Sequence, residues 1–151
     1  MRALGRSRKL VHTVVVPGID RNTPIPAFSR GASILLIEDD FAIRRSIAEL
    51  LSEEGYDVTS AANGREALAV LADPGARPHL IILDLLMPTM NGIEFRIAQT
   101  SLARLADVPV LVITASRFLP RELEPLGLPH VLRKPLHLEE LLQNVATLTS
   151  H

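Results

Sequence analysis

Acidic side chains directly follow two of the most apolar stretches of this sequence. Glu38 and Asp39 come after the run at 33–37 (SILLI), and Asp84 comes after the run at 80–83 (LIIL). If these acids meet in one crevice, their like charges repel each other and the arrangement is costly without a cation. Oxygen ligands with no His or Cys among them favour Mg²⁺. The three carboxylates are therefore candidate ligands of a magnesium ion.

A hydroxyl and an ammonium group follow two further stretches. Thr114 comes after the run at 108–113 (VPVLVI), and Lys134 comes after residues 130–133 (HVLR). Only one other lysine occurs in the chain, which otherwise uses arginine, and this favours a specific need for Lys134. A point charge and a hydroxyl suit a group with several anionic oxygens, namely a phosphoryl group. With a carboxylate as nucleophile, the set indicates phosphoryl transfer to Asp84, giving an acyl phosphate.

Each of these residues also has an ordinary structural interpretation. Acids at 38–40 can cap the helix that follows them, and Asp40 is expected to do only that. Asp84 precedes a proline-containing loop, where aspartate is common. Thr114 could bond to the main chain, and Lys134 could be a solvated surface charge. The chemical interpretation therefore depends on the whole set and not on any single residue.

The apolar runs predict a parallel sheet that would bring these residues together. Continuous Leu, Ile and Val suit strands that are buried on both faces, and segments with helical spacing separate them. The predicted strands are residues 33–37, 56–60, 80–83, 108–113 and 130–133, and the predicted helices are residues 41–54, 65–71, 92–100, 118–129 and 138–148. This alternation is typical of an α/β, doubly wound, five-stranded parallel sheet with helices on both faces. With the strand order 2-1-3-4-5, the candidate residues meet in the crevice beside the switch point between strands one and three.

Composition and charge limit the class of protein. Of the 151 residues 47% are apolar, enough for one sizeable core, and no cysteine is available for a disulfide or a thiolate metal site. No apolar run has the length of a membrane-spanning helix, so we expect no membrane insertion. Residues 1–31 carry six Lys/Arg and one acid, whereas residues 32–151 carry ten and sixteen. We expect a basic extension without regular structure at 1–32, with an arm that touches an acidic partner or nucleic acid as the alternative. Residues 33–151 are expected to form one acidic domain that does not bind nucleic acid directly.

Four short motifs, taken in order, resemble the receiver domains of two-component response regulators. They are IEDD at 37–40, DLLMPTMNG at 84–92, TAS at 114–116 and RKP at 133–135, each closing an apolar strand. The resemblance covers about residues 33–150 and implies a cytoplasmic bacterial protein of phosphorelay signalling. Its phosphoryl group would come from a sensor histidine kinase or a phosphotransfer protein. Phosphorylation would alter a surface that a downstream protein target reads, without turnover of a substrate as in an enzyme.

The resemblance also implies a set of metal ligands. Asp39 resembles the direct Mg²⁺ ligand, and Glu38 resembles the acid that holds the metal through water. Asp84 is a ligand as well, and the backbone carbonyl of Leu86 resembles a further one.

The remaining roles concern the phosphoryl group. By resemblance, Asp84 is the phosphoacceptor, Thr114 is the switch hydroxyl, and Lys134 is the lysine that binds the phosphate. The family also leads us to expect a cis peptide bond before Pro135.

The sequence departs from the family at positions that bear on signalling. The family usually has Tyr or Phe three residues before the lysine, where this chain has Val131, and the helix expected at 118–129 is short and rich in proline. Our hypothesis is that the signal is read through the loop after Thr114 and this short segment. Leu86 and Ser116 stand where family side chains flank the water that hydrolyses the acyl phosphate. Neither holds a water as an amide or acid would, so we predict a long-lived phosphoprotein.

Two other functions on the same fold stay open. One is a non-phosphorylated interaction module, which the departure at Val131 favours. The other is a hydrolase with Asp84 as nucleophile, but Leu86 stands where its second acid would be expected. Because no segment follows the last predicted helix, we expect a single-domain regulator without an output domain.

Overall fold

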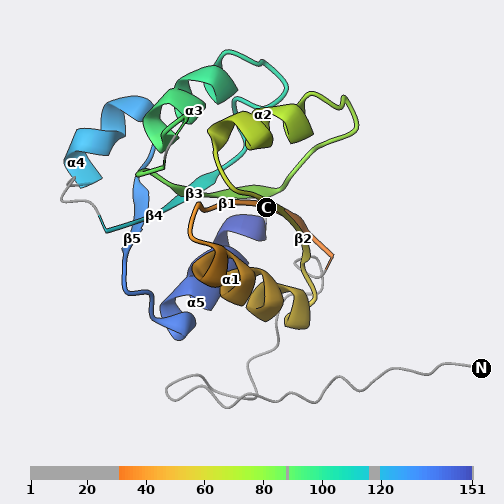
Figure 1. The fold of residues 1–151 in the computed structure, drawn as a ribbon, viewed down its shortest axis with the longest axis vertical. Coiled ribbons are helices and arrows are strands. Elements are labelled where there is room, and N and C mark those ends of the chain that lie inside the picture. Colours follow the sequence, from red (N-terminus) through yellow and green to blue (C-terminus); the bar gives the residue numbers. More distant parts are fainter. Residues whose placement is uncertain (1–30, 88, 116–119, 151) are drawn as a thin grey trace, which may run out of the picture.

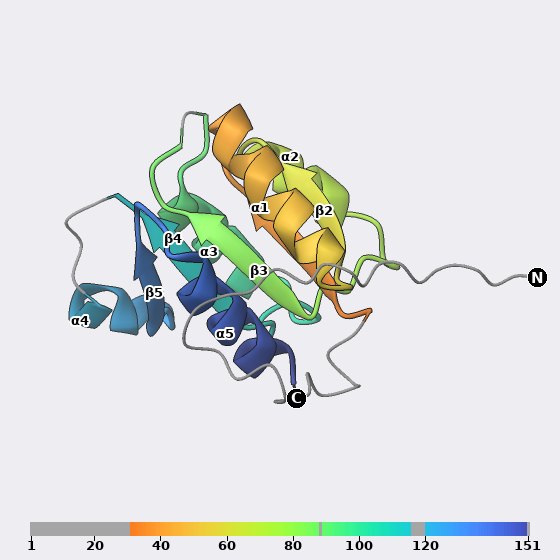
Figure 2. The ribbon, with the colours of Figure 1, turned by 90° about the horizontal axis from the view of Figure 1, so that it is seen from below.

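The computed structural model describes residues 31–87, 89–115 and 120–150 as a sheet with helices on both faces (Figures 1 and 2). The strands are β1 (Ser33–Ile37), β2 (Asp57–Ala61), β3 (Leu80–Asp84), β4 (Val110–Thr114) and β5 (His130–Arg133). The helices are α1 (Phe41–Glu53), α2 (Gly64–Leu71), α3 (Gly92–Thr100), α4 (Pro120–Leu123), the 3₁₀ turn η3 (Glu124–Leu126) and α5 (Leu138–Thr149). All four strand pairings are parallel, and the strand order is β2-β1-β3-β4-β5. This is the predicted doubly wound α/β fold.

The two faces of the sheet have separate apolar cores. Helices α1 and α5 cover one face, and α2 and α3 cover the other (Figure 1). Successive residues of a strand point to opposite faces, so Ile34 and Leu36 belong to the core under α1 and α5, while Leu35 and Ile37 belong to the other core. Every residue of β3 and β4 is buried, whereas the outer strands β2 and β5 have exposed positions. Burial on both faces explains why the central strands are continuously apolar.

Two strands begin later than the sequence pattern predicted. The N–H of Val108 donates to the carbonyl of Leu105 (3.1 Å) in the preceding turn, and Pro109 has no N–H for the ladder, so β4 begins at Val110. The N–H of Tyr56 donates to the carbonyl of Leu51 (3.1 Å) at the end of α1, so β2 begins one residue later. The predicted apolar segments were right, but local turn bonds set their starts.

The segment between β4 and β5 is short, as its prolines predicted. It contains the four residues of α4 and the three of η3, and it ends at Gly127 in the left-handed conformation (φ 70°). The predicted start of this helix at Phe118, and Ser116 before it, lie outside the described residues.

Residues 1–30 of the expected basic extension also lie outside the described residues. Gly31 and Ala32 already bond to the fold, through Gly31 N–H to Gly55 O (2.9 Å) and Asp57 N–H to Ala32 O (3.0 Å). Within the described part of the chain, no helix is both long and apolar enough to cross a lipid bilayer.

Candidate functional site

The end of β1 places one acid inside the protein and one on its surface. Glu38 is fully buried, and its Oε2 accepts a hydrogen bond from the N–H of Asp40 (3.0 Å), while the side chain of Asp39 is exposed. The side chain of Asp40 caps α1 by accepting from the N–H of Ile43 (2.9 Å), as predicted. The turn into α1 thus separates a capping acid from the two acids that face the crevice.

An arginine that the sequence analysis did not single out supports this turn. Arg44 Nη1 donates to the main-chain carbonyls of Glu38 (2.8 Å) and Asp39 (3.2 Å). Its neighbour Arg45 instead forms an exposed ion pair with Glu49. The two arginines are adjacent in the sequence but occupy different positions around α1, so Arg44 reaches the turn and Arg45 stays at the surface.

Asp84 is the last residue of β3, and its carboxyl is held by the loop that follows. The side chain is buried, and its Oδ1 accepts from the N–H of Leu86 (3.1 Å). The loop returns at Gly92, whose N–H donates to the carbonyl of Leu85 (2.9 Å). A Cβ at Gly92 would lie 2.6 Å from the carbonyl oxygen of Asp84, so only glycine permits this close return. The leucine at 86 has an exposed side chain, and its proposed carbonyl ligand stays a prediction.

Strand β5 leads to Lys134, whose ammonium group lies beside Asp84, and β4 ends with Thr114 next to the register partner of Asp84. In the sheet register Asp84 pairs with Ile113, and the buried Thr114 follows it. The N–H of Lys134 donates to the main-chain carbonyl of Thr114 (2.9 Å), and the Lys134–Pro135 peptide bond is cis, as the family resemblance led us to expect. Thr114 and Lys134 therefore meet at the edge of the sheet that carries the acids.

The side chain of Lys134 bridges the two buried acids. Its Nζ lies 2.8 Å from Glu38 Oε1 and donates a hydrogen bond to Asp84 Oδ2 at 3.3 Å. Burial raises the pKa of Glu38 to about 7 and also raises the pKa of Asp84. Burial alone would lower the pKa of Lys134, but the nearby carboxylates of Glu38 and Asp84 outweigh it and raise this pKa. One ammonium group thus faces more negative charge than it can neutralise.

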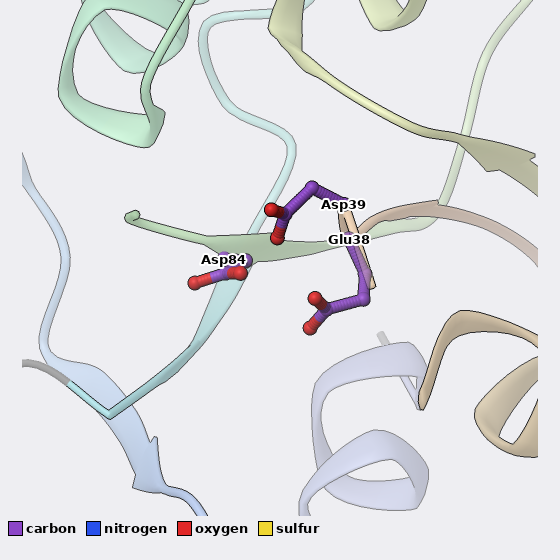
Figure 3. Close-up of side chains that lie close together, drawn as sticks. All are labelled: Glu38, Asp39 and Asp84. Carbon is purple, nitrogen blue, oxygen red and sulfur yellow. The ribbon is translucent and has the colours of Figure 1, made fainter. Parts of the chain in front are cut away.

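Carboxylate oxygens of Glu38, Asp39 and Asp84 all lie within 4.8 Å of one another (Figure 3). The figure shows the first two at the end of β1 and the third at the end of β3. These hard oxygen donors and the excess of negative charge fit a Mg²⁺ ion. The structure therefore brings together the three acids and the lysine that the sequence singled out.

The family model of the response regulator receiver domain matches residues 34–146. The chain belongs to this family. The response regulator MprA of Mycolicibacterium vanbaalenii is 38% identical over 117 residues, which are 76% of this chain and 49% of that protein. This receiver chain thus spans about half the length of the curated relatives it matches.

Solved receiver structures agree with the fold. The chemotaxis response regulator CheY4 of Vibrio cholerae is 34% identical, with a TM-score of 0.69 over 78% of this chain and 98% of that one. The response regulator TrrA of Thermotoga maritima, solved in complex with Mg(2+)-BeF, is 29% identical, with a TM-score of 0.68 over the same shares. Receiver domains are signalling modules of two-component systems, which implies a histidine kinase or phosphotransfer protein as partner.

The switch position departs from the usual aromatic residue, as the sequence indicated. Val131 is half-buried in β5 and packs against the apolar core on the side of α2 and α3. Leu123 and Leu128, which flank η3, belong to the same core. A valine at this position has no large ring of the kind that the family usually carries there.

Proposed function

We propose that Asp84 accepts a phosphoryl group from a histidine kinase or phosphotransfer protein in a Mg²⁺-dependent reaction. The observation that supports this most is the contact of Lys134 with both Asp84 and Glu38. A buried carboxylate that ends a strand beside an ammonium group is placed to attack phosphorus while its new oxygens find a positive charge. The acids of β1 supply the metal site that the same reaction needs.

The transfer from a phosphohistidine forms one bond and breaks another. A carboxylate oxygen of Asp84 attacks the phosphorus, and a P–O bond forms as the P–N bond breaks. The electron pair of the broken bond stays on the donor imidazole, which takes up a proton. Mg²⁺, held by Glu38, Asp39, Asp84 and the carbonyl of Leu86, would neutralise negative charge on the phosphoryl oxygens when bound.

Lys134 changes its main partner in this proposal. Its Nζ is now nearer to Glu38 Oε1 (2.8 Å) than to Asp84 Oδ2 (3.3 Å). A phosphoryl group on Asp84 carries more negative charge than the carboxylate it replaces and draws Nζ and the hydroxyl of Thr114 toward it. The strand ends of β4 and β5 move with these side chains and shift the segment that connects them between two states, which a partner protein reads.

The test is incubation of the full chain with acetyl phosphate and Mg²⁺, followed by intact-mass measurement. The wild type should gain the mass of one phosphoryl group, and the matched variant Asp84→Asn should gain none, because an amide is not a nucleophile here. Omission of Mg²⁺ should also prevent the gain.

The other outcomes identify the alternatives. If the wild type gains no adduct under any condition, the protein is an interaction module that works without phosphorylation. Val131 favours this alternative. Continuous release of phosphate over many turnovers would identify a hydrolase.

A further inference from the structure

Helix α3 contains a buried charged residue that the phosphoacceptor site does not use. Gly92, Phe95, Arg96 and Gln99 form its buried stripe, so an arginine and a glutamine occupy positions where apolar residues are usual. Arg96 is 8% exposed, whereas its apolar neighbour Ile97 is 56% exposed. Burial of a charged guanidinium group is costly unless hydrogen bonds satisfy its donors. Arg96 must therefore have specific partners.

Those partners are main-chain carbonyls at the end of the segment between β4 and β5. Arg96 Nε donates to the carbonyl of Leu126 (2.8 Å), and Nη2 donates to that of Gly127 (3.2 Å). The last carbonyls of a helical turn lack partners within the turn and carry partial negative charge, so a cation suits them. Among the described side chains, no carboxylate forms an ion pair with Arg96. Its charge is therefore balanced by peptide dipoles.

Gln99 fixes the orientation of this arginine. Its Oε1 accepts from Arg96 Nη1 (2.8 Å), and its Nε2 donates to the carbonyl of Leu105 (2.8 Å) in the loop before β4. The side chains of α3 thus join the residues that precede β4 to those that precede β5. Strand β4 ends at Thr114, and β5 leads directly to Lys134.

Gly127 provides the space that this arrangement needs. Its φ of 70° is readily adopted by glycine, and its N–H donates to the carbonyl of Glu124 (2.8 Å). A Cβ at this position would lie 2.7 Å from Arg96 Nη2. The turn and the buried arginine therefore fit each other, and a change in either one disturbs the other.

The segment has little else to hold it. Helix α4 and η3 together have seven residues, and of the side chains described there and at the following turn only Leu123 and Leu128 are buried. Pro120 and Pro125 also remove main-chain donors. Figures 1 and 2 show α4 next to β5, and Figure 1 shows it on the same side of the sheet as α3. Leu126 is partly buried against the same core. With so small an apolar contact, the hydrogen bonds of Arg96 make a large contribution to the attachment of the segment at one end.

We propose that Arg96, oriented by Gln99, is a positioning residue that anchors the C-terminal end of the α4–η3 segment, so that the segment opens from its α4 end. The anchor is a property of the unmodified protein. Only the trigger rests on the proposed function: phosphorylation of Asp84 would rearrange the α4 end while Gly127 and the start of β5 at His130 keep their places. A partner protein would then recognise the changed position of α4 while the C-terminal end of the segment stays fixed.

The test is amide hydrogen exchange of the full chain, measured by mass spectrometry on overlapping peptides across residues 120–133. The amides of Gly127 and Leu128, which donate to Glu124 O and Leu123 O, should exchange more slowly in the wild type than the amides of α4. Arg96→Met keeps the apolar stem and removes every donor. It should raise exchange at Gly127 and Leu128 about tenfold, the effect of losing one charge-assisted hydrogen bond, and abolish the gradient.

The matched control is Arg104→Met. Arg104 also donates to main-chain carbonyls, those of Leu71 at the end of α2 and of Ala76 after it. Its loss should raise exchange around residues 71–77 and leave the α4–η3 segment unchanged. If Arg96→Met unfolds the chain, Gly127→Ala tests the same contact from the other side, and Arg96→Lys should restore part of the protection. Equal exchange in wild type and both Arg96 and Gly127 variants would overturn the anchor.

A second arm uses beryllofluoride with Mg²⁺ as the probe of the modified state. In the wild type, exchange should change in α4 and stop before Leu126, and in Arg96→Met the change should extend through Leu128. A wild-type response that includes Gly127 and Leu128 overturns the anchor. If beryllofluoride changes nothing, the proposed phosphoacceptor function fails. The difference in exchange between α4 and the amides of Gly127 and Leu128, measured without beryllofluoride, still tests the anchor.

Discussion

Two buried ionic clusters in this protein are built in opposite ways. At the ends of β1 and β3, Glu38 and Asp84 share one ammonium group, that of Lys134, and burial raises the pKa of both acids. Beside η3, the guanidinium group of Arg96 faces neutral carbonyls and the amide of Gln99. The first cluster has an excess of negative charge. In the second, the partners found among the described residues are neutral groups whose oxygens face the guanidinium group.

The difference is between a cluster with unbalanced charge and a cluster whose charge is balanced by neighbouring dipoles. An excess of buried negative charge lowers stability, and in the proposed function it is this excess that binds a Mg²⁺ ion before the phosphoryl group arrives. A cation that donates to two main-chain carbonyls and to a side-chain amide offers little to a ligand and favours one conformation. Substitutions in the first cluster should therefore change chemistry more than stability, and those in the second should do the reverse.

The largest effect is expected for Lys134→Met in the first cluster. Loss of the ammonium group that faces the incoming phosphoryl oxygens should lower the initial rate of phosphorylation by acetyl phosphate about a hundredfold. The control Arg45→Met breaks an exposed ion pair with Glu49 and should leave the rate unchanged. A rate within twofold of wild type for Lys134→Met would show that this charge has no part in the transfer.

Arg96→Met in the second cluster should have the next largest effect, on stability. It leaves two main-chain carbonyls and the amide of Gln99 without their charged partner, so the free energy of unfolding should fall by about 2–3 kcal/mol. Urea unfolding curves of wild type and variant measure this loss. The exposed Arg104 has a smaller role, and Arg104→Met should lose less than about 1 kcal/mol. Phosphorylation of folded Arg96→Met should proceed at the wild-type rate. A rate as low as that of Lys134→Met would contradict the assignment of the first cluster to chemistry and of the second to stability.

A smaller effect is expected from Mg²⁺ itself. At ten times its dissociation constant, the ion should raise the free energy of unfolding of the wild type by about 1.4 kcal/mol, because it binds only the folded cluster. Asp39→Asn should remove most of this gain without loss of stability in the absence of Mg²⁺, since Asp39 is exposed. Asp40→Asn is the control, because asparagine caps a helix as well as aspartate does, and it should keep the full response. Thermal unfolding with and without Mg²⁺ would separate the two variants, and equal responses would refute the ligand assignment of Asp39.

The two clusters also differ in how far the sequence predicted them. Asp84 and Lys134 end or follow strands whose apolar residues are unmistakable, so their meeting follows from the order of the parallel strands. Arg96 gave no such signal, because hydropathy predicts that Ile97 is buried and Arg96 is exposed, the reverse of what the structure shows. Its burial depends on carbonyls thirty residues away in the chain, which no local pattern contains. Similarly, β4 begins at Val110 because Pro109 has no N–H for the ladder and because Val108 bonds to the preceding turn, and the apolar run does not reveal this turn bond.

The smallest predicted effect concerns the open side of the first cluster. Leu86 is 54% exposed, next to the carboxyl that its own N–H holds, and a leucine side chain cannot orient a water molecule. Leu86→Asn adds an amide there, so the acyl phosphate should hydrolyse several-fold faster while the rate of its formation stays the same. The control Leu102→Asn changes an exposed leucine beyond α3 and should leave the decay unchanged. The decay of the phosphorylated mass after removal of acetyl phosphate measures both. Faster decay in Leu86→Asn alone would show that the hydrolytic water reaches the first cluster beside residue 86. Equal decay would mean that the leucine does not set the lifetime of the acyl phosphate.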